Sequence, residues 1–231
     1  LPECPQLPLL PAAANEGTPS FFRLSQQWDA SQWQRLRSRC QQQGVSPSAL
    51  LLTLYAETMA RWSASRHFCL NLTVMDRPDV HPQVAALIGD FTSVSLLEAD
   101  LRATCTLGER VNQLQTRLWQ DLEHNAFSGV STIRELARQR GSQRARMPVV
   151  LTSALVSDEH APDTATALPG DAPFTRGISQ TPHVWLYCQV MPFPGAPLIH
   201  WDVSYGLFPA GTVAAIFLPT TAQCARALQA A

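Results

Sequence analysis

The stretch HVWLYCQVMPFPGAPLIHWDVSY (183–205) carries the clearest structural pattern in the chain. Residues 183–191 and 198–205 are rich in apolar side chains, and the segment PFPGAP between them is rich in Pro and Gly. Two such runs around a turn-forming segment are typical of a β-hairpin. Asp202 lies inside the second run, so the stretch predicts a hairpin with one carboxylate embedded in an apolar strand.

Other parts of the chain have the alternating or continuous apolar patterns of β-strands. They are a short edge strand at 21–25 and the segments 68–74, 93–99 and 147–155. Helical patterns lie between them along the chain. This mixture predicts an α/β fold in the broad sense, with a mixed sheet covered by flanking helices.

The helices are indicated by their caps as well as by their periodicity. Ser46 and Pro47 are the residue types that cap and begin a helix, and ALLLTLYAETMARW (49–62) is apolar on most sides, which predicts a buried helix. Other helices are expected from about Ser31 to Gly44, from 107 to 124, from Ser131 to Gly141 and from about Ala210, where Pro219 should break or kink the last one.

Composition excludes several classes of function. All 17 basic residues are Arg, so a phosphate-loop lysine and a Schiff-base lysine are both absent. The net charge of −1 gives no indication of a nucleic-acid or membrane partner, and no apolar run reaches the roughly 18 residues of a membrane span. The six Cys form no CxxC pair and have no His at metal-binding spacing, so we expect no metal site. Reduced thiols in the cytoplasm are the simpler interpretation.

The start of the chain suggests a piece of a longer polypeptide. It consists of the Pro-rich LPECPQLPLLP and has no initiator Met. We therefore interpret residues 1–20 as an extended linker. Residues 157–177 contain Asp, Pro, Gly and Thr without periodicity, which predicts a mobile loop.

Two stretches place polar groups where a strand begins or ends. In IGDFTS (88–93), Asp90 could accept backbone N–H bonds and tie a loop to the strand at Thr92, or it could take part in chemistry directly. In PVVLTSAL (148–155), Ser153 ends an apolar strand, where hydroxyls more often cap a turn than act as nucleophiles. No Gly-x-Ser-x-Gly motif surrounds it, which excludes a hydrolase nucleophile of that type.

Two further stretches belong to the hairpin region. In ISQTP (178–182), Ser179, Gln180 and Thr181 could simply begin a strand, because Pro182 forces the preceding residue towards extended geometry. Asp202 follows Trp201 within an apolar strand, where a carboxylate must be paired, hydrogen-bonded or exposed to a cleft. Burial would raise the pKa of such a group towards the range useful for proton transfer. Asp202 is thus the best acid/base candidate in the chain, with a purely structural Asp as the alternative.

Together, five stretches resemble the heterocyclization domains of nonribosomal peptide synthetases, which are condensation-domain relatives that form thiazoline and oxazoline rings. They are LNLTVMDRPDVHPQVAALIGDFTSVSLLE (70–98), LWQDLEHNAFSGVSTIRELAR (118–138), MPVVLTSAL (147–155), ISQTPHVWLYCQV (178–190) and WDVSYGLFP (201–209). Their order and spacing follow the family over almost the whole chain, from the linker to about residue 209.

The family domain resembles a pair of lobes, each similar to chloramphenicol acetyltransferase. The resemblance implies that residues 1–20 are the linker between the lobes and that residues 21–231 are the C-terminal lobe. The signature motif of the N-terminal lobe is missing here. Thr181 and Asp202 correspond to the family residues regarded as catalytic for cyclodehydration. The resemblance places the following residues beside them as supporting or tunnel-lining groups: Asp90, Thr92, Ser153, Ser179, Gln180 and Trp201.

The partners implied by the resemblance are the N-terminal lobe, upstream and downstream carrier domains, and an adjacent adenylation domain. The carrier domains deliver acyl and Cys, Ser or Thr thioesters on phosphopantetheine, and the lobe itself binds no cofactor. The product would be a siderophore-type peptide, and the isolated lobe is expected to fold without being active.

Several positions depart from the family pattern. They are Asp76, Tyr187, His200, Tyr205 and Pro219. These departures leave open a second hypothesis, in which a catalytically degenerate lobe acts as a docking or structural module for carrier or adenylation domains. A free-standing acyltransferase is a third and more remote possibility, because its HHxxxDG motif is missing.

Overall fold

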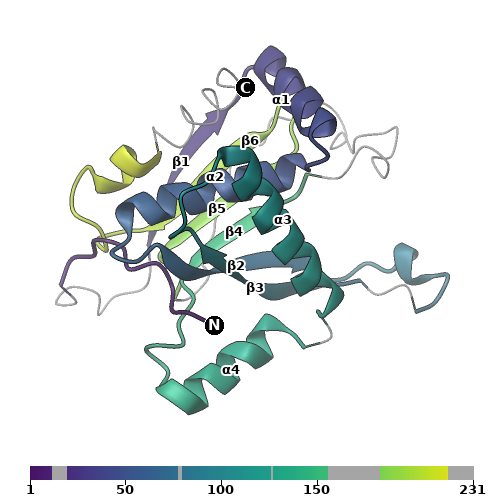
Figure 1. Ribbon diagram of the computed structural model, residues 1–231. Coiled ribbons are helices and arrows are strands. Elements are labelled where there is room, and N and C mark those ends of the chain that lie inside the picture. The colour runs from purple at the N-terminus through teal and green to yellow at the C-terminus, as the bar shows by residue number, and fades with distance from the viewer. Residues whose placement is uncertain (12–19, 78–79, 126, 156–182, 218–231) are drawn as a thin grey trace.

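The computed structural model describes residues 1–11, 20–77, 80–125, 127–155 and 183–217. Its elements are β1 (Phe21–Gln27), α1 (Ala30–Gln42), α2 (Pro47–Trp62), β2 (His67–Met75), the 3-10 helix η1 (Val84–Ala86), β3 (Thr92–Asp100), α3 (Leu107–Glu123), α4 (Gly129–Arg140), β4 (Val149–Ser153), β5 (Leu186–Met191) and β6 (Leu198–Ser204). Within these residues, six strands form one sheet in the order β1-β6-β5-β4-β2-β3 (Figure 1).

The sheet is mixed, as the sequence predicted. Strand β4 runs parallel to β2 and to β5, and every other pair is antiparallel. Strands β5 and β6 form the expected hairpin, and β1 is the expected edge strand. An α/β fold with a mixed sheet and flanking helices is therefore confirmed.

Helices lie on both faces of the sheet, but they cover them unequally (Figure 1). Trp33 and Leu36 of α1 and Val111 of α3 join the main core together with the strand residues Leu70 and Leu97. The only other cluster among the described residues lies on the opposite face, where α4 packs over Cys69, Leu96 and Met147. The helices α1, α2 and α3 therefore define a core face, and α4 covers part of the other face near β2 and β3.

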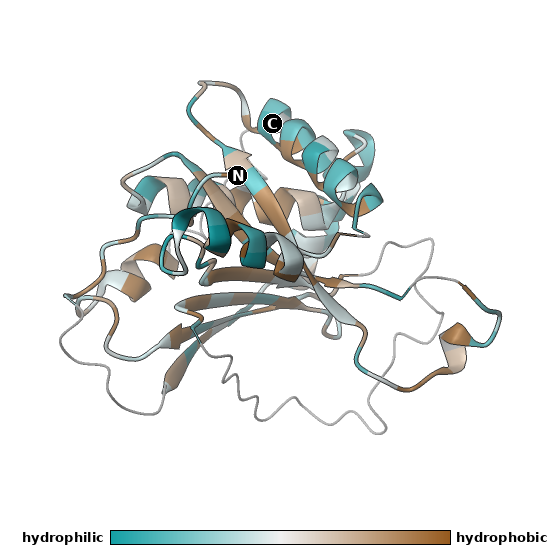
Figure 2. Ribbon diagram, turned by 90° about the horizontal axis from the view of Figure 1, so that it is seen from below, coloured by the Kyte–Doolittle hydropathy of each residue, from teal (hydrophilic) through white to brown (hydrophobic). Residues whose placement is uncertain are grey.

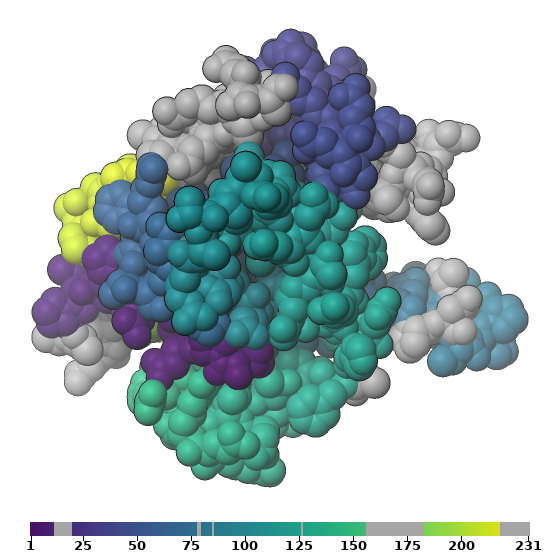
Figure 3. All heavy atoms as spheres, in the orientation of Figure 1, coloured from purple at the N-terminus to yellow at the C-terminus, as the bar shows by residue number. Residues whose placement is uncertain are grey.

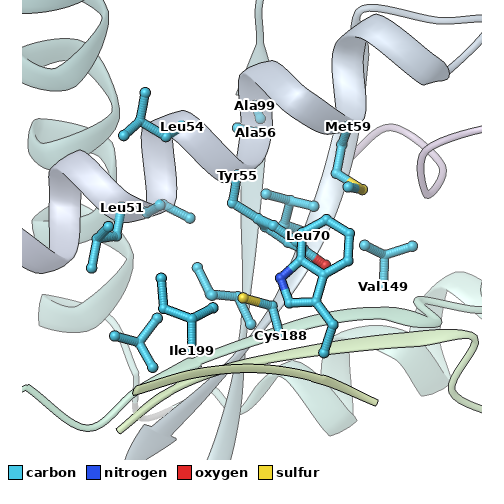
Figure 4. Packing of buried hydrophobic residues seen from close by; sticks show 14 of the residues in the cluster. Leu51, Leu54, Tyr55, Ala56, Met59, Leu70, Ala99, Val149, Cys188 and Ile199 are labelled. Atoms are coloured by element: carbon cyan, nitrogen blue, oxygen red, sulfur yellow. The ribbon is translucent and has the colours of Figure 1, made fainter. Parts of the chain in front are cut away.

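Aromatic packing anchors the core face. The ring of Trp201 on β6 meets Tyr55 of α2 edge to face, with centroids 5.7 Å apart, and meets Phe217 at 5.3 Å. Figure 4 shows Tyr55 above the sheet, close to Leu70 and Cys188. Such pairs add to the stabilisation that burial of the rings provides. The apolar helix predicted at 49–62 is thus buried because it packs directly on the central strands.

Several element boundaries differ from the sequence prediction by a few residues, and two of these differences have a clear local reason. The helix expected to start at Ser131 begins at Gly129, because Ser128 is the cap that accepts the Ser131 N–H at 3.3 Å. Gly129 is needed there, since a Cβ would lie 2.6 Å from the Val94 carbonyl oxygen. The strand expected from residue 183 begins at Leu186, because His183 has a φ of 65°, which is incompatible with a strand.

The Pro-rich N-terminal segment lies along the lobe. The Cys69 N–H donates to the Glu3 carbonyl at 2.8 Å, and Arg144 forms an ion pair with the Glu3 side chain at 2.6 Å. Figure 3 shows this segment packed between the body of the lobe and α4. The predicted loop at 157–177 and the kink at Pro219 lie outside the described residues.

The connection between β2 and β3 extends away from the sheet, whereas the strands form a mostly hydrophobic centre (Figure 2). Its apolar side chains Val80, Leu87 and Ile88 are exposed. No described helix combines the length and apolarity needed to cross a bilayer.

Candidate active site

The second face of the sheet carries a row of side chains centred on Asp202. Strand register places Asp202 of β6 opposite Arg23 of β1 on one side and opposite Tyr187 of β5 on the other. Tyr187 is in turn opposite Val150 of β4. Because side chains alternate between faces along a strand, these residues share the face away from Trp201. We call this surface the polar face.

Asp202 is buried and accepts three hydrogen bonds from neighbouring side chains. The Arg23 Nε donates to Oδ1 and the Arg23 Nη2 donates to Oδ2, both at 2.6 Å. The Gln189 Nε2 donates to Oδ2 at 3.1 Å. The Asp202 side chain is 4% exposed and that of Arg23 is 21% exposed. The forked ion pair therefore offsets the cost of removing this carboxylate from water.

The next row of the polar face is also hydrogen-bonded. His200 lies opposite Ser25 on one side and Gln189 on the other, and its Nδ1 is 2.8 Å from the Ser25 Oγ. The hydroxyls of Thr152 and Tyr187 are 2.8 Å apart. Asp202 is therefore one of several hydrogen-bonded polar side chains that β1, β6, β5 and β4 place on this face.

The pKa values of Arg23 and His200, which lie beside Asp202, are shifted from their ordinary values. The hydrogen bond to Asp202 raises the pKa of Arg23, so this guanidinium stays charged. Burial lowers the pKa of His200 below 6.5, and the charge of Arg23 lowers it further. The imidazole of His200 is thus neutral at physiological pH, and the charges in this region belong to the Arg23–Asp202 pair.

Thiolate chemistry is not favoured at the buried cysteines. Burial raises the pKa of Cys40 to about 11 and that of Cys69 to about 12. Both thiols are therefore protonated at neutral pH and are poor nucleophiles. Within the described part of the chain, no group of three or more His, Cys, Asp or Glu side chains is arranged to hold a metal ion.

The structure brings together only some of the residues that the sequence singled out. Trp201 points into the core on the other face. Ser153 also lies on the core face, where its Oγ is 2.8 Å from the Ser48 Oγ of α2. Ser179, Gln180 and Thr181 lie outside the described residues.

Asp90 and Thr92 lie at the opposite edge of the sheet from Asp202. The Thr92 N–H donates to the exposed Asp90 carboxylate at 2.9 Å, and hydrogen bonds to Thr92 lower the pKa of Asp90. Thr92 begins the edge strand β3, and β2, β4 and β5 separate β3 from β6. This arrangement matches the structural alternative, in which Asp90 ties a loop to the next strand.

The sequence did not single out the two residues that hold Asp202. Arg23 of β1 and Gln189 of β5 both donate hydrogen bonds to its carboxylate. The alternation along β5 places Gln189 on the same face as Tyr187, so its orientation could have been found. The pairing of Arg23 with Asp202 could not have been found from local sequence patterns, because it joins residues 179 positions apart.

Comparison with protein families places this architecture among known ones. The family model described as "Condensation domain" matches residues 2–161. The chain is 42% identical over 221 residues to pyochelin synthetase PchF of Pseudomonas aeruginosa and 38% identical over 223 residues to phenyloxazoline synthase MbtB of Mycobacterium tuberculosis. Each alignment covers 94% of the chain but only 12% and 15% of these relatives, respectively.

Solved structures agree with this relationship. The nonribosomal peptide synthetase FmoA3 superposes with a TM-score of 0.87 at 34% identity, over 100% of this chain and 23% of that chain. The EpoB cyclization-docking bidomain of Sorangium cellulosum gives 0.82 at 31% identity, over 99% of this chain and 46% of that chain. The chain is therefore homologous to a part of much larger proteins, and the expected acetyltransferase-like lobe is confirmed.

Proposed function

Because the chain belongs to the condensation-domain family, we propose that it is the C-terminal half of a heterocyclization domain in a nonribosomal peptide synthetase of the siderophore type. The observation that carries the proposal is Asp202, a buried carboxylate held by defined donors at the position where the family resemblance places a catalytic group. The names of the relatives, which include a cyclization-docking bidomain and a phenyloxazoline synthase, support the same chemistry.

The proposed reaction has two stages and needs no oxidant or nucleotide. In the first, the amine of Cys, Ser or Thr attacks an acyl thioester, and the phosphopantetheine thiol leaves as an amide forms. In the second, the side-chain sulfur or oxygen attacks the amide carbonyl carbon while its proton passes to the carbonyl oxygen. The resulting hydroxyl leaves as water with a further proton, and loss of the nitrogen proton completes the C=N bond.

Asp202 is suited to move protons in the second stage. A carboxylate has about four acceptor positions. Arg23 occupies one on each oxygen, and Gln189 occupies a second one on Oδ2. The described residues thus leave one position, on Oδ1, for a proton taken from the substrate and returned to the leaving hydroxyl. We assign Thr181 the role of orienting Asp202 or of hydrogen-bonding that hydroxyl, as the resemblance implies.

The partners follow from this assignment. An N-terminal lobe would complete the tunnel, and carrier domains would deliver both substrates on their phosphopantetheine arms. An adenylation domain would load the amino acid. The lobe needs no bound cofactor of its own, since the reactive thioesters arrive on the carrier domains.

One observation favours the alternative of a catalytically degenerate docking lobe. Tyr187 stands opposite Asp202, where the family resemblance expects an acidic residue, and its hydroxyl is 2.8 Å from Thr152. A second carboxylate is therefore replaced by a neutral pair of hydroxyls. If that carboxylate were essential, the lobe would bind carrier domains without forming rings.

The test uses the complete synthetase, with a benzoyl-loaded upstream carrier domain as the probe and cysteine, serine and threonine as separate acceptors. Asp202→Asn keeps the size of the side chain and some of its hydrogen bonds. We expect this variant and Thr181→Ala to accumulate the linear amide instead of the ring product. The ring product is recognised because its mass is lower than that of the linear amide by one water. Asp100→Asn, at an exposed ion pair, is the control and should cyclise normally.

Mass spectrometry of the products released from the carrier domain separates the hypotheses. Undiminished ring formation by Asp202→Asn would eliminate the catalytic role of Asp202. Absence of ring formation in the unmodified synthetase with all three acceptors would favour the docking lobe. Ring formation by the 231-residue chain alone would contradict the requirement for an N-terminal lobe.

A further inference from the structure

We propose that Arg23 is a positioning residue for the ring-closing stage, which holds the Asp202 carboxylate in the orientation needed for proton transfer. This inference rests on the proposed function, because it gives Arg23 a task only if Asp202 acts on the substrate. Arg23 lies in the predicted edge strand, and neither the sequence patterns nor the family resemblance singled it out.

The geometry of the contact fixes both the place and the plane of the carboxylate. Arg23 and Asp202 are directly opposite in the β1–β6 register, and two parallel N–H···O bonds of 2.6 Å join them. A single donor would let the carboxylate rotate about its Cβ–Cγ bond. A planar fork bound to both oxygens prevents this rotation, which a lysine ammonium cannot do.

The remaining contacts make Arg23 the dominant constraint. Gln189 reaches only Oδ2, at the longer distance of 3.1 Å. Without Arg23, the carboxylate would keep one neutral donor among the described residues. It would then be able to turn its Oδ1 away from the position where the substrate proton arrives. Displacements of this kind are costly to catalysis, because a misplacement of about 1 Å can slow a reaction by roughly a hundredfold.

The chain contains a matched pair outside the site. Arg102 and Asp100 form the same fork, with Nε–Oδ1 at 2.9 Å and Nη2–Oδ2 at 2.6 Å. Their side chains are 64% and 46% exposed. Arg102→Lys therefore makes the same chemical change as Arg23→Lys, in a fork that pairs the same atoms but does not contact Asp202.

The experiment measures the ratio of ring product to linear amide in the complete synthetase, with the benzoyl-loaded carrier domain and cysteine as probes. We expect Arg23→Lys to lower this ratio by roughly ten- to a hundredfold while total amide formation stays near normal. Arg102→Lys should leave the ratio unchanged. Arg23→Ala should also lose ring formation and regain part of it when guanidinium ion is added, since the ion can occupy the vacated space.

The outcomes distinguish the inference from the proposed function. If Asp202→Asn still forms rings undiminished, the catalytic role of Asp202 in the proposed function fails, and the inference about Arg23 fails with it. If Asp202→Asn loses rings but Arg23→Lys keeps the normal ratio, the positioning role of Arg23 is wrong. Equal losses of linear and cyclic product in Arg23→Lys would show a structural role only and would also overturn the inference. Should Arg23→Lys fail to fold, Arg23→Gln is judged by the same ratio.

Discussion

The two faces of the sheet use the same strands for opposite purposes. On β6, Trp201 packs into an apolar core against Tyr55, whereas the next residue, Asp202, joins Arg23 and Gln189 on the polar face. Contacts on the core face are numerous and non-directional. Contacts on the polar face are few and depend on distance and angle. Of two adjacent residues in one strand, Trp201 therefore belongs to the apolar core, and Asp202 belongs to the polar face to which we assign the chemistry.

This separation keeps the buried carboxylate out of the apolar core and beside the donors that offset its burial. Asp202 is 3% exposed and sits beside residues of the core in sequence, but alternation directs it away from them. Substitutions on the core face should therefore lower stability most, and substitutions on the polar face should do so less, in proportion to the interaction removed.

The largest effect is expected at Trp201. Trp201→Ala removes a fully buried indole and its contacts with Tyr55 and Phe217. We expect a loss of about 3–5 kcal/mol in the free energy of unfolding, measured by urea denaturation followed by circular dichroism. Trp119, which is 54% exposed, is the matched control, and Trp119→Ala should change stability by less than about 0.5 kcal/mol. Similar losses in both variants would contradict the assignment of the core face.

A smaller loss is expected when the ion pair of the polar face is removed. Asp202→Ala leaves Arg23 without its carboxylate, and we expect a loss of about 2 kcal/mol, because hydrogen bonds to charged groups contribute more than neutral ones. Arg23 is partly exposed, so water can replace some of the lost contact. Asp100→Ala removes the exposed fork and should have little effect on the same denaturation curve. Equal losses of unfolding free energy in Asp202→Ala and Asp100→Ala would mean that burial does not strengthen the Arg23–Asp202 pair.

Removal of one hydroxyl should cost less again. Tyr187→Phe eliminates the 2.8 Å hydrogen bond with Thr152 and leaves the ring in place. We expect a loss of about 1 kcal/mol in the free energy of unfolding. Adding Thr152→Val to this variant should not lower the free energy of unfolding by the same amount again, because the hydrogen bond between the two hydroxyls is already lost. Full additivity of the two substitutions in a double-mutant cycle would show that the hydroxyls do not interact. Tyr205→Phe, at a side chain that is 68% exposed, is the control.

The smallest effect is expected for the contribution of His200 to the pH dependence of stability. Burial, followed by the charge of Arg23, lowers the pKa of His200 below 6.5 in the folded chain. The unfolded chain therefore binds more protons than the folded chain just below pH 6.5. The contribution of His200 to stability is complete above that pH and declines as the pH falls below it. His200→Asn should flatten the stability curve below pH 6.5.

The measurement is the difference in unfolding free energy between the two proteins across pH. This difference should stay constant above about pH 7.5, where the imidazole is neutral in both states. It should then change in favour of His200→Asn as the pH falls below 6.5. A constant difference across the whole range would show that His200 titrates equally in the folded and unfolded chains.

Local pattern was sufficient for much of the fold and for part of the site. The apolar runs around PFPGAP predicted the β5–β6 hairpin, and Ser46 with Pro47 marked the start of α2. Asp202 was identified because a carboxylate within an apolar strand requires a partner. These features depend on neighbours within a few residues, where spacing and residue type already restrict the backbone.

The partner of that carboxylate depended on the tertiary structure. Arg23 and Asp202 are 179 positions apart, and only the antiparallel pairing of β1 with β6 brings them together. Alternation along β6 turns Trp201 to the opposite face from Asp202. The register of β4, β5 and β6 aligns Ser153 with Val190 and Ile199, which places Ser153 on the same face as Trp201. Sequence patterns fix which residues form each strand, whereas the order and register of the strands decide which side chains meet.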